Sequence, residues 1–289
     1  MSWRCAGMRW SGGAPRLVWL GDRGERTSTL AYGQEPAFRA VGERHCLGVR
    51  RNPCPTRAVV PARVTRAQCE ACARLDRARS VAADTMADDP RPYAVYLAWF
   101  GPGMLKVGIT AVERGPARLL EQGAVAFTWL GRGPLMAARR TEELLRTALG
   151  VPDRIPYADK RAVRAVLPPE DVRAAEVEAL YGRAVALEGW PESLERAGCG
   201  VVDHVEVFGL GQAPGATAVV TELRDGGAVA GRLVAAAGPD LHLRSPRGEV
   251  LIVDTRLMAG WELARAEAGA PTTVPVRVLA GPDVQEGLF

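Results

Sequence analysis

The chain has 289 residues, 47% of them hydrophobic and 24% charged, with a formal net charge of +4 at pH 7, a composition typical of a soluble protein of two or three domains. No apolar run approaches the roughly 18 residues that cross a bilayer, and no N-terminal stretch resembles a signal peptide. Membrane, secreted and fibrous classes are therefore excluded, and we expect a cytoplasmic protein.

Residues 1–81 are predicted to form short strands around a metal ion rather than around an apolar core. Residues 16–20 follow a Gly-Gly-Ala-Pro turn and predict one of these strands. Residues 82–92 lack periodicity and carry acids and prolines, which indicates a linker.

The cysteines indicate the metal. Five of the six fall within the first 72 residues, and four of these have the spacing C-x7-C-x14-C-x2-C. Clustered thiols in a reducing compartment are more typical of metal ligands than of disulfides, and zinc prefers four converging thiolates. We predict a structural zinc site, ribbon-like in type, with ligands Cys46, Cys54, Cys69 and Cys72. His45 or Cys5 is the alternative to Cys46, because C-x7-C is longer than common zinc spacings.

Residues 92–152 predict a small α/β domain. Two β-rich runs on either side of Gly101-Pro102-Gly103 indicate a hairpin. After it we expect a helix from residue 113 or 116 to Gln122, with Gly123 as its C-cap, a strand over 125–130 and a helix over 135–149.

The remaining chain predicts a helical connector over 153–199 and a β-rich domain over 200–289, so that the fold class is α+β. The connector is broken at Pro168-Pro169 and carries an apolar stripe for core packing, formed by Val177, Leu180, Ala184 and Leu187. The tail predicts a small barrel or sandwich of consecutive hairpins. Strands are expected over 217–223 and 228–234 on either side of Asp225-Gly226-Gly227, and over 241–244 and 249–253 on either side of Ser245-Pro246-Arg247-Gly248.

The first strands of the α/β domain carry candidate chemistry. Ala94-Val95-Tyr96 is followed after nine residues by Lys106-Val107-Gly108, and an arginine lies on the next helix. This arrangement resembles the GIY-YIG nuclease superfamily. The resemblance implies metal-dependent cleavage of phosphodiesters, with Mg²⁺ or Mn²⁺ as cofactor and four candidate catalytic residues, Tyr96, Lys106, Arg118 and Glu142, with Glu143 as the alternative to Glu142.

Longer segments resemble a second family. HCLGVRRNPC, QCEAC, YLAWFG, KVGIT, RLLEQGA and ARRTEELL are similar to the bacterial family called domain of unknown function 2797, most closely over residues 40–150. That family has no established activity for the resemblance to imply.

Chemical reasoning assigns a role to each candidate catalytic side chain. Tyr96 is expected to accept a proton if Lys106 lowers its pKa. Arg118 offers a planar fork to a phosphate, and Glu142 would hold a hydrated divalent cation. The role of Gln122, one helical turn after Arg118, stays open.

Uneven charge indicates the partner. Residues 1–80 carry a net charge of +9, residues 81–199 of −1 and residues 200–289 of −4, and a basic segment is typical of a protein that binds DNA or RNA. Only two of the 37 basic residues are lysines, so that a coding bias toward arginine is the competing explanation. Phosphate contacts are expected from Arg50, Arg51, Arg57, Arg63 and Arg66, and base stacking from Trp3, Trp10 and Trp19.

Two non-catalytic functions remain as alternatives. Ala94 and Lys106 replace a glycine and a tyrosine of the superfamily motifs, which favours a nucleic-acid-binding regulator without cleavage. The second alternative is a protein-interaction adaptor, in which zinc only stabilises the fold and the β-rich tail binds a protein partner.

Overall fold

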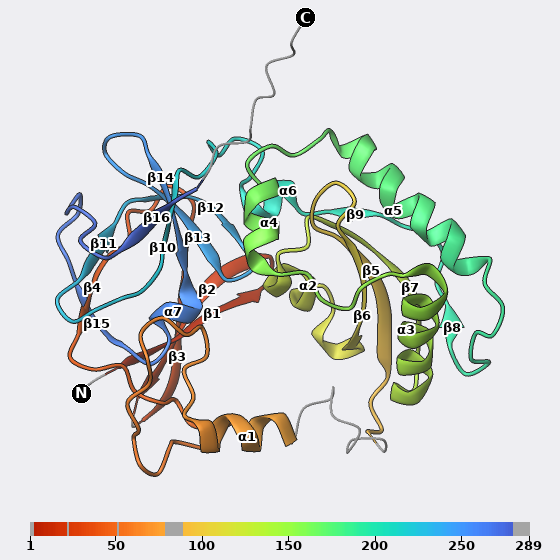
Figure 1. Cartoon of the computed structure of the whole chain (residues 1–289), viewed down its shortest axis with the longest axis horizontal. Helices are drawn as coiled ribbons and strands as arrows, with labels where there is room; N and C mark the ends of the chain where they lie inside the picture. The colour runs from red at the N-terminus through yellow and green to blue at the C-terminus, as the bar shows by residue number, and fades with distance from the viewer. Residues whose placement is uncertain (1–2, 22, 51, 79–88, 280–289) are drawn as a thin grey trace, which may run out of the picture. The chain divides into compact units, whose positions relative to one another are not determined.

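The protein is described from a computed structural model, which covers residues 3–21, 23–50, 52–78 and 89–279. It is an α+β protein, as the sequence predicts. The chain groups into two compact units (Figure 1), which we call the split unit, residues 1–79 with 212–289, and the central unit, residues 80–211. Within the described ranges, no helix has the length and apolar character needed to cross a membrane.

The first sheet of the split unit is built from both ends of the chain. Its strand order is β11-β4-β15-β1-β2-β3, and every neighbouring pair is antiparallel. The strands are β1 (Arg4–Ser11), β2 (Ala14–Gly21), β3 (Gly24–Thr29), β4 (Ala37–Val41), β11 (Ala228–Ala230) and β15 (Glu262–Arg265). Segments that the sequence assigns to separate domains, 1–81 and 200–289, therefore share one sheet.

The second sheet of the split unit comes from the C-terminal segment alone. Its order is β12-β13-β14-β10-β16, with β10 (Ala218–Val220), β12 (Arg232–Ala237), β13 (Asp240–Arg244), β14 (Val250–Asp254) and β16 (Val276–Val278). The predicted hairpin of β13 and β14 is confirmed. Two short helices complete the unit, α1 (Glu70–Ala78) and α7 (Thr255–Met258).

The predicted pairing of residues 217–223 with 228–234 is wrong. β10 pairs in parallel with β14 and in antiparallel with β16, whereas β11 pairs with β4. The run over 228–234 divides at Gly231, where a Cβ would meet the Arg244 carbonyl oxygen at 2.9 Å. The chain thus passes from the first sheet to the second at a residue without a side chain.

Buried Arg44 connects the N-terminal and C-terminal segments of the split unit. Its guanidinium donates to the carbonyl oxygens of Ala259 at 2.8 Å and Arg256 at 3.0 Å, and to those of Pro61 and Val64 at 2.6 Å each. Burial lowers the pKa of Arg44 to about 10. Several carbonyl partners satisfy donors that would otherwise be buried without a hydrogen bond.

The central unit has a sheet of order β6-β5-β7-β8, with β9 also paired to β7. The strands are β5 (Tyr93–Trp99), β6 (Leu105–Ala111), β7 (Ala126–Gly133), β8 (Glu195–Arg196) and β9 (Val202–Asp203). The predicted β5–β6 hairpin is confirmed. Because β8 and β9 complete this sheet, the end of the predicted connector and the start of the predicted β-rich tail belong to the central unit.

Helices cover the sheet of the central unit. They are α2 (Ala117–Gln122), α3 (Leu135–Leu149), α4 (Tyr157–Val163), α5 (Glu170–Val185) and α6 (Val205–Phe208), with a single 3-10 turn η2 (Val112–Arg114). α3 matches its predicted range, and α5 follows the Pro168-Pro169 break. Residues 186–199 contain no helix, contrary to the helical connector expected over residues 153–199.

The two faces of β5 contact different helices. Val95 and Leu97 pack in one cluster with Leu145 of α3 and Leu180 of α5, as Figure 1 shows with these two helices along the sheet. The alternate residues Tyr96 and Ala98 pack in another cluster, with Leu119 of α2. Period-two alternation therefore directs Tyr96 toward α2.

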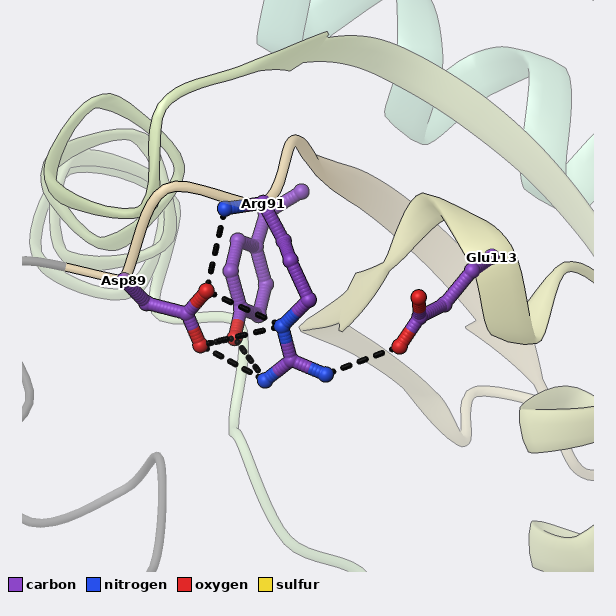
Figure 2. A network of polar contacts seen from close by, with 4 residues as sticks. Asp89, Arg91 and Glu113 are labelled. Atoms are coloured by element: carbon purple, nitrogen blue, oxygen red, sulfur yellow. Dashed lines mark hydrogen bonds and ion pairs between the residues drawn. The ribbon is translucent and has the colours of Figure 1, made fainter.

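A polar network holds the start of the central sheet (Figure 2). Arg91 contacts the Asp89 carboxylate with Nη2 at 2.6 Å and the Glu113 carboxylate with Nη1 at 2.8 Å, and the Tyr93 hydroxyl donates to Asp89 at 2.7 Å. The pKa of Asp89 is lowered far below its usual range, mainly because the Arg91 side chain donates to the carboxylate. The network connects the segment before β5 with η2, which leads into α2.

Candidate functional site

Four cysteines of the split unit converge. The sulfur atoms of Cys46, Cys54, Cys69 and Cys72 all lie within 4.8 Å of one another, the one such group of three or more possible metal ligands among the described residues. Cys54 and Cys69 have their sulfurs 3.9 Å apart. A tetrahedral ion bound at about 2.3 Å from each sulfur requires separations of this size, so the four thiols could hold a metal ion such as zinc.

Local backbone structure explains why the unusual C-x7-C spacing works. Gly48, two residues after Cys46, has φ +79°, and a Cβ there would meet the Asn52 carbonyl oxygen at 2.0 Å. Only glycine permits this close approach. Val49 and Asn52 then exchange two backbone hydrogen bonds of 2.9 and 2.8 Å. This tight loop returns the chain so that Cys54 lies beside Cys46.

The C-x2-C pair lies at the start of α1. Cys69 immediately precedes the helix and Cys72 lies in its first turn, so one short segment supplies both sulfurs. The Cys46 sulfur accepts the Cys69 N–H at 3.2 Å and the Gly48 N–H at 3.4 Å. The Thr56 hydroxyl is the main cause that lowers the pKa of Cys54 to about 6, whereas burial raises the pKa of Cys72.

The alternative ligands lie outside the cluster. His45 has Nδ1 2.8 Å from the Arg57 carbonyl oxygen. Cys5 is fully buried, which raises its pKa to about 12, and its sulfur accepts the Gly7 N–H at 3.3 Å. Neither residue belongs to the group of converging thiols. Cys199 is exposed.

The central unit brings Tyr96 and Lys106 together on neighbouring strands. Tyr96 is paired with Gly108, and Lys106 with Ala98, so the Lys106 Nζ lies 5.9 Å from the centre of the Tyr96 ring. A Cβ on Gly108 would lie 2.4 Å from the Tyr96 hydroxyl oxygen. Gly108 therefore leaves space for the Tyr96 side chain.

Electrostatics connect these two strands with α2 and α3. Tyr96 is 1% exposed and Lys106 8%. The pKa of Lys106 is lowered to about 8, first by burial and then by repulsion from Arg118, against an opposing attraction to Glu142. The same two charges act on Tyr96. The charges of Arg118 and Glu142, on α2 and α3, therefore reach both Tyr96 and Lys106 on the two strands.

The expected direction of the Tyr96 shift is reversed. Burial of the ring raises the pKa of Tyr96, although a hydrogen bond from Gln122 opposes the shift. Lys106, in contrast, has a lowered pKa and so gives up its proton more readily. The sequence could not show this, because the direction depends on burial.

Glu142 and Glu143 differ in their surroundings. Glu142 is half-buried, and burial raises its pKa while Lys106 lowers it. Glu143 is exposed and binds Arg146, with 2.6 Å between Oε1 and Nη2. Only Glu142 therefore faces the charges around Tyr96, and it is the better candidate of the two.

Arg118 remains partly accessible. Its side chain is 42% exposed and lies 3.9 Å from the Glu121 carboxylate, which Arg114 also contacts closely. Part of its guanidinium is thus free to meet solvent or a ligand.

Sequence reasoning missed two contributions to this site. The Gln122 side chain, to which the sequence assigns no role, donates from Nε2 to the Tyr96 hydroxyl at 2.7 Å. Asp153 was not considered: its carbonyl oxygen accepts the Lys106 Nζ at 3.1 Å, and its charge acts on both Lys106 and Glu142. The position of Gln122 one turn after Arg118 was the available signal for the first, and nothing local indicated the second.

The arginines proposed to contact phosphates are mostly at the surface. Arg50, Arg57, Arg63 and Arg66 are exposed, and Arg51 lies outside the described residues. Two of them have acidic neighbours: Arg50 lies 3.9 Å from Asp76, and Arg63 binds Glu222 at 2.7 Å.

The three tryptophans differ in availability. Trp10 is 3% exposed and donates to the Gly238 carbonyl oxygen at 2.9 Å, so the expectation that it stacks on bases is wrong. Trp3 and Trp19 are half-buried, and the Arg26 guanidinium lies 4.2 and 5.9 Å from their ring centres.

Comparison with known proteins gives one match. The family model described as "Protein of unknown function (DUF2797)" matches residues 33–263. A search of curated proteins and a search of solved structures found no match to the chain.

Proposed function

Because the chain belongs to the domain of unknown function 2797 family, whose description assigns no activity, we propose a function from the sites themselves: a zinc-containing protein that binds nucleic acid and cleaves phosphodiesters with a divalent cation. The observation that supports cleavage is that Lys106 and Tyr96 lie together, with Nζ 5.9 Å from the ring centre, where the charges of Arg118 and Glu142 act on both. The resemblance of residues 94–96 and 106–108, on β5 and β6, to the GIY-YIG motifs supports the same proposal.

The proposed chemistry follows from the state of each group. Lys106, with its lowered pKa, takes a proton from the attacking water in its neutral form. Tyr96 keeps its proton and donates it in a hydrogen bond to a phosphoryl oxygen. Arg118 offers its exposed guanidinium to the same phosphate. The water oxygen forms a bond to phosphorus, and the bond to the leaving oxygen breaks as that oxygen takes up a proton from solvent water.

Glu142 is the residue that would hold Mg²⁺ or Mn²⁺. Burial and the charge of Asp153 disfavour the negatively charged form of this half-buried side chain, and a bound cation would relieve both effects. One carboxylate suffices, because Mg²⁺ keeps several waters and shares oxygens of the phosphate. When bound, the cation stabilises the charge that develops on the phosphate.

The proposed metal of the split unit is zinc in a structural role. Four thiols are a donor set that zinc prefers, and a closed set of four leaves no position for a reacting water. Free thiols with this role require a reducing compartment, which supports a cytoplasmic location. Metal analysis of purified protein should give one zinc per chain, and Cys54→Ser with Cys69→Ser should abolish it.

Cleavage is tested with end-labelled DNA and RNA in single-stranded, double-stranded and branched forms, with Mg²⁺ or Mn²⁺. Arg118→Ala and Glu142→Gln should each reduce cleavage by about 10²-fold or more, the size typical of removing one transition-state contact. Glu143→Gln is the matched control on the same helix turn and should retain native activity. If the native protein cuts none of these substrates, the proposed cleavage is refuted.

A non-catalytic nucleic-acid-binding regulator is the second candidate, because Tyr96 is almost fully buried. This function predicts that Glu142→Gln leaves affinity for nucleic acid unchanged.

For a nuclease and for a non-catalytic regulator alike, affinity for nucleic acid should fall steeply with salt, since contacts to phosphates release counterions. Binding that is insensitive to salt would contradict a role for Arg50, Arg57 and Arg66. Recovery of a protein partner without any retained nucleic acid would favour an adaptor.

A further inference from the structure

Both lysines of this arginine-rich chain contact the surroundings of the central site: Lys106 lies beside the Tyr96 ring, and Lys160 binds the backbone of Gln122, whose side chain contacts Tyr96. Lys106 belongs to the segment Lys106-Val107-Gly108, whereas Lys160 belongs to none of the motifs in the sequence. Lys160 lies on α4 and is 3% exposed. Its Nζ lies 3.8 Å from the centre of the Phe100 ring and 4.5 Å from that of Tyr157, and it donates to the Gln122 carbonyl oxygen at 3.1 Å.

Lys160 is part of a set of contacts from α4 to the end of α2. The Tyr157 hydroxyl donates to the Glu121 carbonyl oxygen at 3.1 Å, Lys160 to that of Gln122 at 3.1 Å, and Arg164 to that of Gly123 at 3.2 Å. Residues 157, 160 and 164 share one face of a helix. We call these three residues the α4 clamp, because they bind three successive carbonyls.

The helix α2 depends on such support. It has only six residues, and no side chain caps its N-terminus, whereas isolated helices this short are unstable in water. Its C-terminal carbonyls are the groups that cations stabilise most. The clamp therefore fixes the helix whose first turn carries Arg118 and whose last residue is Gln122.

Gln122 connects the end of α2, which the clamp holds, with Tyr96. It is 7% exposed and its Nε2 donates to the Tyr96 hydroxyl at 2.7 Å. We infer that Lys160 is a positioning residue of the central site, which acts through the Gln122 backbone to hold the side-chain amide against Tyr96. This inference rests on the proposed function for its catalytic consequence, but the positioning itself is measurable without any activity.

The direct measurement is hydrogen exchange of the Gln122 side-chain amide, followed by NMR on the whole chain. Lys160→Met removes the ammonium and keeps an unbranched apolar side chain. We expect its Gln122 amide protons to exchange about tenfold faster or more, because loss of the contact frees the end of α2. The backbone amides of β5 and β6 should keep their native exchange rates. Asp159→Met, the exposed residue before Lys160 on α4, is the control and should leave the Gln122 amide unchanged.

A double-mutant cycle separates positioning from a general effect on folding. In a Tyr96→Phe background the amide has lost its partner, so Lys160→Met should add little to its exchange rate. Equal effects in both backgrounds, or native exchange of the Gln122 amide in Lys160→Met, would refute the inference. If Lys160→Met does not fold, Lys160→Leu provides the same test, since it also removes the ammonium that binds the Gln122 carbonyl oxygen and keeps an apolar side chain.

Kinetics complete the test where the native protein cleaves nucleic acid. Lys160→Met should lower kcat by about tenfold with little change in KM, the pattern of a misplaced reacting group. An inactive native protein would refute the proposed cleavage, but the exchange data would still decide whether Lys160 positions Gln122.

Discussion

At the scale of single residues, burial decides which group of the central site can move a proton. Lys106 and Tyr96 occupy adjacent strands, and both lose contact with water. Burial disfavours a charged lysine and a charged tyrosine alike, so it lowers the pKa of Lys106 to about 8 and raises that of Tyr96. Near neutral pH the lysine is therefore the group that titrates.

This gives a pH dependence for cleavage. A base must be neutral, so the rate should rise about tenfold per pH unit below the pKa of Lys106 and level off above about pH 8. Lys106→Arg should remove this rise and reduce the rate by at least about 10²-fold, because a guanidinium stays charged. Steady-state rates from pH 6 to pH 9.5 measure the profile. A native profile that is flat through pH 8 would contradict the role of Lys106 as base.

Arg44 gives a prediction of stability at the same scale. Arg44→Met removes the donor for four carbonyl oxygens in buried or part-buried hydrogen bonds, and should lower the free energy of unfolding by about 2–4 kcal/mol. Urea unfolding monitored by tryptophan fluorescence measures this. Arg39→Met, on the exposed side of β4, is the control and should change stability by less than about 0.5 kcal/mol. Equal stability of the two variants would show that the Arg44 contacts contribute little.

At the scale of elements, the sequence predicts those parts whose reasons are local. α3 has its predicted range because an apolar face, a preceding proline and a terminal Gly150 in the left-handed region all agree. The four cysteines converge as predicted because Gly48 and a helix start set their geometry. The pairing of β10 and β11 was not predictable, since a turn sequence such as Asp225-Gly226-Gly227 indicates a reversal but not which strands it joins.

The metal loop is an element whose structure depends on its ion. Residues 46–78 contain only a small apolar cluster, made largely of the cysteines themselves. Binding free energy of a structural metal therefore acts as folding free energy there. Treatment with a chelator should melt α1 and expose Cys46 and Cys72 to thiol reagents, while the amides of β5–β7 stay protected. Native thiol protection after complete metal removal would contradict this.

At the scale of the whole molecule, the central unit is inserted into the split unit. β1 pairs with β15, more than 250 residues away, and β4 pairs with both β11 and β15. A single sequence carries the periodicity of each strand but no information on partners this distant. The predicted division at residues 81, 152 and 199 follows changes of pattern along the chain, whereas the structure groups its segments by pairing.

This insertion predicts how the metal site depends on the far end of the chain. The backbone N–H of His45, which immediately precedes Cys46, donates to the Gly260 carbonyl oxygen at 2.9 Å, and the Gly260 N–H donates to the Cys5 carbonyl oxygen at 2.8 Å. Arg44 adds its contacts with Arg256 and Ala259.

A chain that ends at Gly211 retains all four cysteines but loses these partners. Its zinc affinity should fall by at least about tenfold, the equivalent of about 1.4 kcal/mol. The central unit, which keeps every strand of its own sheet, should retain its exchange protection. Competition with a chromophoric chelator measures the affinity, and native affinity in the shortened chain would show that residues 1–79 fold around the metal without β11 and β15.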